Sequence, residues 1–507
     1  MHRKQPAIFL DRDGTIIEDK EYISDIDDVK IYEDTIPALQ NLQKKYELFV
    51  ISNQNGIAKG RISPAQPDTI NQFIHKVLLD NGIFIRDWYV CPHEEKDNCQ
   101  CMKPSSYFIE KANTEYHLDL KKSFTIGDHP HDVLTGKDYG VFGLYLLTGH
   151  GLRHLKELPK DQLVFHSISH AANWVLRHPE PKIALNSQIT EGAQAIKEGG
   201  LTAFPTETVY GLGANALNKT AVTRIFEAKN RPLHDPLIVH ISDKGQVVEL
   251  TSEVPQKAYA LMEAFWPGPL TLVFPKSQIV PEVVTSGGPT VAIRMPENPW
   301  ALRLIQKAQT PIAAPSANLF GRTSPTTAEH VAEQLGSKCR VIIDAGACRV
   351  GVESTVLSLT QDPPRLLRAG GVSQDEIEGI IGPISVSGKE TERKKEGPGM
   401  LKDHYAPNTP LYIVESIAEY TGEDNIGILL YSEPDKEFKG TVEVLSRSGK
   451  ASDAAVNLYA AIRRLDALGL RYIVSELNKE NGIGHALNDR LEKAAQKTGI
   501  PEKKRES

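Results

Sequence analysis

Potential metal ligands gather in the short stretch "CPHEEKDNCQC", residues 91–101, which holds three of the five cysteines of the chain. Such a cluster is a disulfide staple, a metal site or a loop of free thiols. An odd cysteine count argues against a disulfide framework, and paired disulfides seldom persist in a reducing compartment. Three thiolates and one imidazole are the soft tetrahedral set that suits structural zinc and leave no position for water. We therefore predict a Zn²⁺ site that holds a loop, with ligands Cys91, His93, Cys99 and Cys101.

A pair of carboxylates follows the first apolar stretch, "AIFLDRDGT". Asp11 and Asp13 are two apart, so on a strand they point the same way, into the crevice where open α/β sheets bind ligands. They would repel each other unless a cation lay between them, and hard oxygen ligands suit Mg²⁺. Two further apolar stretches end in Ser52 and in Asp128, with Asp132 nearby. The plain alternative is a pair of solvated acids at a strand end.

Cations and hydroxyl groups mark a second region, between residues 201 and 325. "LTAFPTETVYGLGANA" predicts an apolar strand, then Thr206 and Thr208, then a glycine-rich turn. Lys229 and Arg231 follow, and "TVAIRMP" puts Arg294 at the end of another strand. This pattern indicates an anion site, although exposed loop cations would look the same. The P-loop motif G-x-x-x-x-G-K-[ST] does not occur, so any ATP is bound in another way.

The pattern of strands and helices around Asp11, Ser52 and Asp128 predicts a doubly wound α/β domain. Five short stretches between residues 7 and 147 are apolar throughout, as buried parallel strands are. Between them, residues 35–46 and 68–82 have the apolar spacing of helices, and 169–178 predict a closing helix. Residues 179–182, "PEPK", predict a linker.

A second unit is expected to begin near residue 187 with a helix that a glycine pair ends, and to continue as a mixed α/β pattern. A polar connector rich in Gly and Pro follows. Strands at 410–414, 426–431 and 471–477, with a helix at 454–469, predict a small Rossmann-like α/β domain. The expected domains are 1–178, 187–386 and 409–507, with a connector at 387–408.

Length and composition agree with several globular domains. The chain has 507 residues, too many for one core, and its 40% hydrophobic and 24% charged residues are ordinary for a soluble protein. A net charge of -7 gives no general basic field for nucleic acid. The start lacks the layout of a signal peptide, and no apolar run approaches the roughly 18 residues of a membrane span. We expect a cytoplasmic protein without membrane contact.

Residues 6–150 resemble the haloacid dehalogenase superfamily of phosphatases, whose D-x-D-G-T signature is present in full. The resemblance implies that Asp11 attacks phosphorus and that Asp13 is the general acid and then the general base. It implies that Ser52 and Lys103 hold the phosphoryl oxygens. Mg²⁺ would be held by Asp11, Asp128 and the backbone carbonyl of Asp13.

Within that superfamily, "SNQNGIAKG" and "CPHEEKDNCQCMKP" are similar to the compact, cap-lacking heptose-bisphosphate and histidinol-phosphate phosphatases, whose zinc loop covers the active site. Met102 stands where those enzymes usually have an arginine that grips substrate. A thioether cannot give bidentate recognition of charge. The resemblance therefore implies a phosphorylated small molecule as substrate and leaves its identity open.

Residues 187–385 resemble the YrdC-type threonylcarbamoyl-AMP synthases, through "FPTETVYGLG", "AKNRPLHDPL", "VAIRMP", "APSAN" and "GVESTV". "GPGMLKDHYAP" and "GIGHALNDRLEKAA" match the linker and extra domain of the longer members. The resemblance implies that threonine, bicarbonate and ATP give threonylcarbamoyl-AMP and pyrophosphate. Transfer machinery would then pass the threonylcarbamoyl group to adenosine in tRNA.

The same resemblance implies two sets of binding residues. Asp235 departs from the usual Asn and would repel a triphosphate unless Mg²⁺ intervened. The connector would be a lid over the nucleotide, so deletion of residues 390–407 should abolish product formation. Threonine would be bound by Thr208, His240, Arg294, the backbone at Ala314, and Ser354. ATP would be bound by Lys229, Arg231, Asp235, Thr290, Ser316, Asn318, Ser324, Arg368 and either His404 or Tyr405.

Three functional hypotheses follow. The first is a bifunctional enzyme, a phosphatase fused to a threonylcarbamoyl-AMP synthase. In the second the middle domain is a non-catalytic RNA-binding module, against which the retained cationic set and the overall acidity argue. In the third it is a carbamoyl transferase of the hydrogenase-maturation type, whose zinc-finger and acylphosphatase-like segments the chain does not match. The first hypothesis is favoured.

Overall fold

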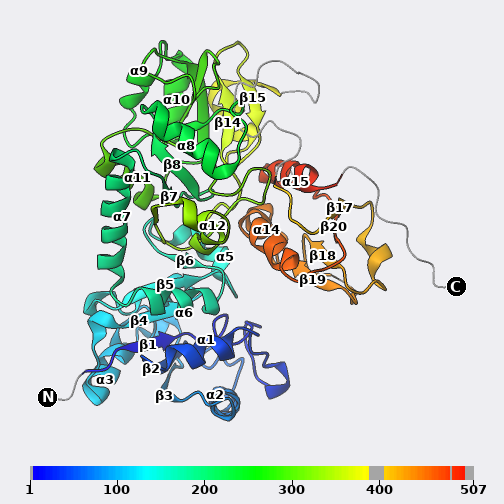
Figure 1. Cartoon of the computed structure of the whole chain (residues 1–507). Helices are drawn as coiled ribbons and strands as arrows, with labels where there is room; N and C mark the ends of the chain where they lie inside the picture. Colours follow the sequence, from blue (N-terminus) through cyan, green and yellow to red (C-terminus); the bar gives the residue numbers. More distant parts are fainter. Residues whose placement is uncertain (1–3, 387–404, 435, 480–481, 497–507) are drawn as a thin grey trace. The chain divides into compact units, whose positions relative to one another are not determined.

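The computed structural model describes residues 4–386, 405–434, 436–479 and 482–496. The chain divides into two compact units, Met1–Leu185 and Asn186–Ser507. Each unit is an α/β structure with its own sheets (Figure 1). None of the helices in these described ranges is long and apolar enough to cross a membrane.

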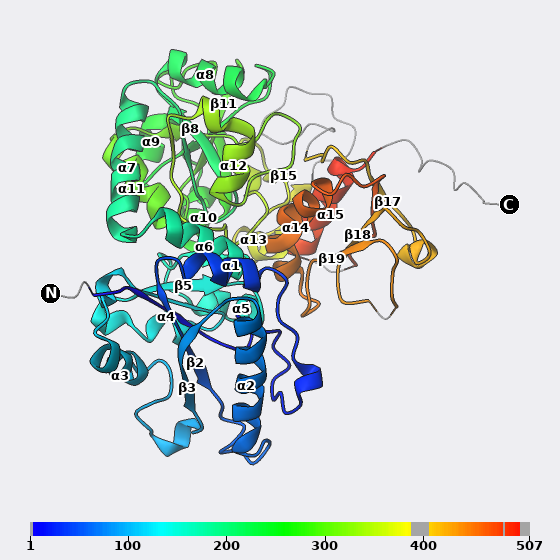
Figure 2. The same cartoon turned by 60° about the horizontal axis from the view of Figure 1, so that its bottom comes forward.

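The first unit is a six-stranded parallel sheet in the order β3-β2-β1-β4-β5-β6. The order reverses beside β1, which makes the sheet doubly wound and opens a crevice at the carboxyl ends of β1 and β4. Helix α3 packs on Phe9, Phe49 and Tyr89 of one face, and α1 and α6 lie side by side (Figures 1 and 2). The strands are β1 (Ala7–Leu10), β2 (Glu47–Asn53), β3 (Ile85–Cys91), β4 (Phe124–Gly127), β5 (Phe142–Leu146) and β6 (Val164–Phe165). The helices are α1 (Thr35–Leu42), α2 (Ala65–Asp80), α3 (Tyr107–Tyr116), α4 (Pro130–Leu134), α5 (Gly151–His154) and α6 (Ile168–Arg177).

The five expected strands and the three expected helices are present in this region. Strand β6 and helices α3, α4 and α5 are elements that the sequence did not predict. The linker predicted at residues 179–182 was wrong in its second half. Helix α7 (Pro181–Lys197) begins inside it and runs across the boundary between the units. Proline is favoured at the first helical position, because its missing N–H would have no partner there and its φ already fits the helix.

A mixed ten-stranded sheet forms the larger part of the second unit, in the order β13-β7-β8-β12-β9-β11-β10-β14-β15-β16. The strands are β7 (Thr202–Phe204), β8 (Gly211–Asn215), β9 (Ile238–His240), β10 (Leu270–Pro275), β11 (Thr290–Arg294), β12 (Ile312–Ala313), β13 (Val341–Ile342), β14 (Thr355–Ser358), β15 (Arg365–Arg368) and β16 (Ser385–Val386). The helices are α8 (Lys219–Lys229), α9 (Gln246–Leu250), α10 (Gln256–Phe265), α11 (Pro299–Ala308), α12 (Ala328–Leu335) and α13 (Gln374–Ile381).

One expectation in this sheet is corrected. "GLGAN" was predicted as a glycine-rich turn, but it is strand β8, which pairs antiparallel with β7 on one side and with β12 on the other. Two flanking strands satisfy its backbone groups, and this pairing outweighs the weak strand propensity of glycine.

The second sheet of this unit is the four-stranded, all-parallel C-terminal sheet, in the order β17-β20-β18-β19. Helices α14 and α15 lie side by side on it (Figure 1). The elements are β17 (Leu411–Ile413), β18 (Gly427–Leu430), β19 (Thr441–Val444), α14 (Ala451–Asp466), β20 (Ile473–Ser475) and α15 (Ile483–Ala494). The predicted strands and helix are present, and β19 was not foreseen.

Candidate functional sites

The first site lies where β1 and β4 end. Asp11 follows β1 and its backbone N–H donates to the carbonyl oxygen of Ile126 on β4 at 2.9 Å, which ties the two strand ends together. Gly14 has φ +81°, and a Cβ there would lie 2.1 Å from a carboxylate oxygen of Asp128. Glycine is therefore required for the chain to turn back against that carboxylate.

Lys103 holds the centre of this site. Its Nζ donates to Asp11 Oδ1 at 2.5 Å and to the carbonyl oxygen of Ile51 at 2.9 Å, and it pairs with Asp132 Oδ1 at 2.6 Å. The side chain is only 5% exposed, so these contacts fix its position. The sequence had placed Asp132 at a strand tip without giving it a role, and this contact makes it the residue that orients Lys103.

Asp13 is held by different partners. The buried guanidinium of Arg12 donates to both of its carboxylate oxygens at 2.8–3.2 Å, and Gln54 Nε2 donates to Oδ2 at 2.8 Å. Gln54 also donates to the hydroxyl of Ser52, which is buried at the end of β2 and does not line the cleft. Asp13 is thus oriented by a fixed positive charge, and it lines the same cleft as Asp11.

Carboxylate oxygens that could hold a cation come from Asp11, Asp128 and Asp132, and lie within 4.8 Å of one another. Burial raises the pKa of Asp11 to about 7. The positive charge of Lys103 opposes this rise, and repulsion by Asp132 and Asp13 adds to it. Burial, with repulsion by Asp11 and Asp132, raises the pKa of Asp128 well above its usual range. The buried carboxylates outnumber the one lysine beside them, so the site lacks positive charge. A divalent cation would supply it. The side chain of Asp13 is outside this group, so only its backbone carbonyl could contribute.

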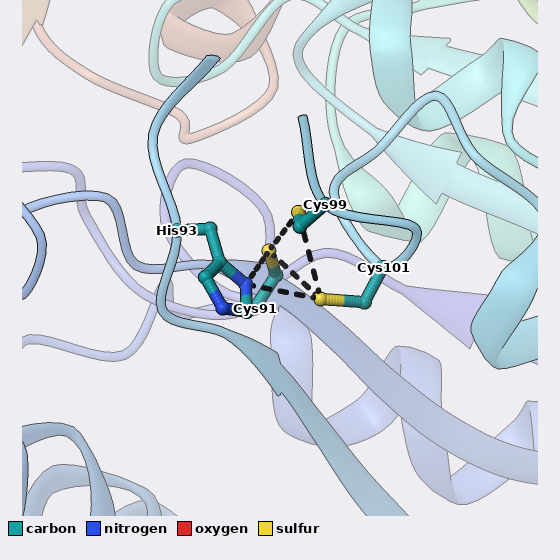
Figure 3. A group of neighbouring side chains, drawn as sticks. All are labelled: Cys91, His93, Cys99 and Cys101. Atoms are coloured by element: carbon teal, nitrogen blue, oxygen red, sulfur yellow. Dashed lines mark hydrogen bonds between the residues drawn. The ribbon is translucent and has the colours of Figure 1, made fainter. Parts of the chain in front are cut away.

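The four predicted zinc ligands meet in one cluster at the end of β3 (Figure 3). The sulfur atoms of Cys91, Cys99 and Cys101 are 3.2–3.7 Å apart, and His93 Nδ1 lies 3.4 Å from Cys101 Sγ and 3.7 Å from Cys91 Sγ. Sulfur ligands about 2.3 Å from a tetrahedral Zn²⁺ are about 3.8 Å from one another, so the cluster has nearly the size of a zinc site. All three cysteines are free of disulfides.

The cluster lies next to Lys103 in the chain. Cys101 precedes Lys103 by two residues, and the Lys103 backbone N–H donates to Asn53 Oδ1 at 3.1 Å. Met102 and Lys103 line the cleft together with Glu94, Glu95 and Lys96 of the same loop. A metal in the cluster would therefore fix the loop that carries Lys103.

The second site is a cavity in the second unit. Eight of the residues predicted to bind threonine or ATP line it, and so does Tyr405 from the end of the connector. The register explains part of this convergence, because Arg294 at the end of β11 is paired with His240 at the end of β9. The eight are Thr208, Arg231, His240, Arg294, Ala314, Ser316, Ser354 and Arg368.

Arg294 is held rigidly in the wall of this cavity. Its guanidinium donates to Thr208 Oγ1 at 2.9 Å, to Glu207 Oε1 at 2.5 Å and to the carbonyl oxygen of Gly268 at 3.2 Å. Glu207 was part of a quoted motif, but it was given no role. Burial and the charge of Arg294 lower the pKa of His240 to about 3, so this imidazole is neutral.

Four predicted ATP ligands are buried behind the cavity lining. Lys229 Nζ donates to the carbonyl oxygens of Ser316 and Asn318, and the amide of Asn318 donates to the carbonyl oxygens of Leu319 and Arg322. The Asp235 carboxylate lies 2.8 Å from the Arg231 guanidinium, although no hydrogen bond of good geometry joins them. These buried side chains do not line the cavity, and they support the loops that do. The fourth, Ser324, donates its hydroxyl to Glu353.

The two remaining predictions have separate outcomes. Thr290 begins β11 while Arg294 ends it, so about 13 Å of strand separates them and Thr290 does not line the cavity. His404 lies outside the described residues, as does most of the predicted lid. Tyr405, the alternative to His404, is buried with φ +70°, and its carbonyl oxygen accepts from Thr323 Oγ1 at 3.2 Å.

Comparison with known proteins assigns both units. A family model described as telomere recombination, of the Sua5, YciO and YrdC group, matches residues 194–370. The model of the threonylcarbamoyl-AMP synthase C-terminal domain matches residues 372–496, and a HAD-hydrolase-like model matches residues 100–171.

Individual relatives agree with these models. The threonylcarbamoyl-AMP synthase of Pyrococcus abyssi is 46% identical over 325 residues, 61% of this chain and 94% of that protein. The crystal structure of P. abyssi Sua5 complexed with L-threonine is 44% identical, with a TM-score of 0.57 over 61% of this chain and 94% of that one. A probable D-glycero-D-manno-heptose-1,7-bisphosphate 7-phosphatase of Thermoplasma acidophilum is 37% identical over 123 residues, 24% of this chain and 77% of that protein.

Proposed function

The chain belongs to the threonylcarbamoyl-AMP synthase family and carries a haloacid dehalogenase-type phosphatase domain ahead of the synthase, and we propose that both units are catalytic. The second unit makes L-threonylcarbamoyladenylate from threonine, bicarbonate and ATP, with release of pyrophosphate and water. The first hydrolyses a phosphomonoester. The match of residues 372–496 to the synthase C-terminal domain favours this function over an RNA-binding module or a carbamoyl transferase.

The observation that carries the synthase proposal is the gathering of three arginines around one cavity. Arg294, fixed by Glu207 and Thr208, is available to the threonine carboxylate. Arg231 and Arg368 line the same cavity, together with Ser316, and supply positive charge of the kind that a triphosphate requires. The neutral His240 is paired in register with Arg294 and adds no further positive charge there.

The reaction needs no covalent residue. The nitrogen of threonine attacks the carbon of bicarbonate, and water is lost. The resulting carboxylate attacks the α-phosphorus of ATP while the bond to pyrophosphate breaks. Fixed arginines would bring the two anions close together and neutralise the leaving pyrophosphate, and these two effects would supply most of the rate enhancement. The threonylcarbamoyl group would then pass to tRNA through separate transfer machinery.

In the phosphatase, Asp11 would attack phosphorus and Asp13, oriented by Arg12 and Gln54, would protonate the leaving alcohol. Asp13 would then take a proton from the water that hydrolyses the aspartyl-phosphate. Lys103 would neutralise the phosphoryl oxygens. Mg²⁺, when held by Asp11, Asp128 and the Asp13 carbonyl, would supply further positive charge at the phosphoryl group. A sugar bisphosphate and a histidinol-phosphate-like ester are the candidate substrates.

Both activities can be tested on one preparation. Purified protein with ATP, threonine, bicarbonate and Mg²⁺ should yield threonylcarbamoyl-AMP and pyrophosphate by mass spectrometry. Absence of both products would contradict the synthase proposal. Release of inorganic phosphate from a panel of sugar phosphates and histidinol phosphate, with and without EDTA, tests the phosphatase. No release from any ester in the presence of Mg²⁺ would contradict it.

A further inference from the structure

The loop between β7 and β8 carries an acid that does not line the synthase cavity but holds a residue that does. Glu207 lies in this loop and is only 3% exposed. Its Oε1 accepts from Arg294 Nη2 at 2.5 Å, and its Oε2 accepts from the backbone N–H of Glu297 at 3.0 Å. Its carbonyl oxygen accepts from the backbone N–H of Val350 at 2.7 Å. Both carboxylate oxygens are thus engaged, and the backbone that carries them is tied down as well.

Arg294 keeps N–H groups that a ligand can use. Besides Glu207, it donates to Thr208 Oγ1 and to the carbonyl oxygen of Gly268. A guanidinium has five N–H groups, so these three contacts leave two of them over. Arg294 lines the cavity, and Glu207 is the one carboxylate that pairs with it in the part of the chain that the structure describes. Because a guanidinium is planar and rigid, the three contacts fix where the remaining N–H groups point.

Thr208 presents the opposite kind of group. The Thr206 hydroxyl lies 2.6 Å from the carbonyl oxygen of Val209 and must donate its only hydrogen there. The Thr208 hydroxyl lies 2.8 Å from the Thr206 hydroxyl, so it must be the donor of that pair. With its hydrogen used, Thr208 can only accept, from Arg294 and from a ligand. A carboxylate in the cavity can therefore bind Arg294 but finds no donor on Thr208.

Glu207 has two opposing effects on an anionic ligand. Its charge weakens the attraction of Arg294 for a carboxylate, whereas its contacts hold the guanidinium in place. The two side chains are almost completely buried, with 3% of Glu207 and 4% of Arg294 exposed. A buried arginine that loses its carboxylate partner is left with an uncompensated charge and turns towards other acceptors. We therefore expect the effect on orientation to outweigh the effect of charge.

We propose that Glu207 is a positioning residue of the synthase, which directs the remaining N–H groups of Arg294 at the carboxylate of the amino-acid substrate. This inference rests on the proposed function, in which threonine occupies the cavity. Glu207 then governs recognition of the carboxylate and not of the rest of the amino acid.

The test compares L-threonine with L-threoninamide, which lacks the carboxylate charge, by isothermal titration calorimetry on the full chain. The wild type should bind threonine at least about 10-fold more tightly than the amide. Glu207→Gln has a single carbonyl oxygen, which cannot accept from both Arg294 and Glu297. Its Kd for threonine should rise at least about 10-fold, and its Kd for the amide should stay within about 3-fold. Glu207→Asp keeps the charge but is one methylene shorter, and should show the same loss.

The matched control is Glu198→Gln, which removes the acid of an exposed pair with Arg340 and should change neither Kd. An equal loss of affinity for both ligands in Glu207→Gln would indicate a purely structural role and overturn the inference. Tighter binding of threonine by Glu207→Gln, or unchanged binding by Glu207→Asp, would overturn it too, because Glu207 would then act through its charge alone. If Glu207→Gln does not fold, Glu207→Asp decides by the same two constants. A wild type that binds neither ligand and forms no threonylcarbamoyl-AMP would instead refute the proposed function.

Discussion

At the scale of single residues, a residue that belongs to a binding motif need not touch the ligand. Lys229 and Arg231 are two residues apart, but Arg231 faces the cavity while Lys229 donates to the carbonyl oxygens of Ser316 and Asn318. The lysine is 1% exposed, and burial lowers its pKa well below the usual range. Its role is therefore to hold the loop from Ser316 to Asn318, and its removal should lower the stability of the fold.

We predict that Lys229→Met lowers the free energy of unfolding by about 2–4 kcal/mol, because two buried carbonyl oxygens lose their hydrogen-bond donor. Urea unfolding of the full chain measures this. Lys219→Met at the exposed start of the same helix is the matched control and should change stability by less than about 0.5 kcal/mol. Equal stability of the two variants would contradict the assignment of Lys229 to the loop.

His240 gives a prediction about pH. Its pKa is about 3 in the folded protein, against an ordinary value near 6.5 in the unfolded chain. Below pH 6.5 the unfolded chain therefore binds a proton that the folded protein does not, and stability falls as the pH decreases towards 3. Between pH 7 and pH 5 the wild type should lose about 2 kcal/mol more than His240→Asn. Unfolding curves with equal pH dependence would show that the imidazole is not buried in the neutral form.

At the scale of elements, the loop between β3 and α3 joins the four predicted zinc ligands to Lys103. Cys91 ends β3, and Cys101 is two residues before Lys103, so the cluster fixes both ends of the loop that covers part of the cleft. Removal of the metal should therefore act on phosphate chemistry through the position of Lys103.

We predict one Zn²⁺ per chain by elemental analysis and a fall of at least about 10-fold in phosphatase kcat/KM for Cys101→Ser. Cys339→Ser, in the second unit, should keep both the metal and the rate. Full phosphatase activity in a zinc-free Cys101→Ser variant would refute the loop-holding role.

At the scale of the whole molecule, each candidate site is built from residues of one compact unit. The phosphatase residues fall within Met1–Leu185 and the synthase residues within Asn186–Ser507. Compact units with their own cores can fold and act as domains in a single chain.

Asp11→Asn should therefore abolish ester hydrolysis, with a loss of at least about 10³-fold in kcat, and leave synthase kcat/KM within about 2-fold. The amide is nearly isosteric but lacks the nucleophilic charge. A parallel loss of synthase activity would mean that the two sites are coupled.

Much of the architecture was predictable because it depends on local pattern. Apolar runs at strand spacing and helix-period stretches identified all five expected strands of the first sheet. Predictions failed where pairing with distant strands determines the local structure. Strand β8 is an example, because it needs β7 and β12 on its two sides. The strands β6 and β19 were also missed, because stretches of two and four residues are too short for a clear periodicity.

The sequence by itself determined which chemistry is available: the Asp11 and Asp13 pair, the four soft ligands, and the arginines at strand ends. Residue type and spacing suffice there, because charge and ligand chemistry belong to the side chains. Only the tertiary structure decided which of these groups face a cavity and which support it. Lys229 and Arg231 differ in this way, and Arg490 reaches Glu353 across 137 residues of sequence. Burial and hydrogen-bond partners are set by contacts between distant segments, and these exist only once the chain is folded.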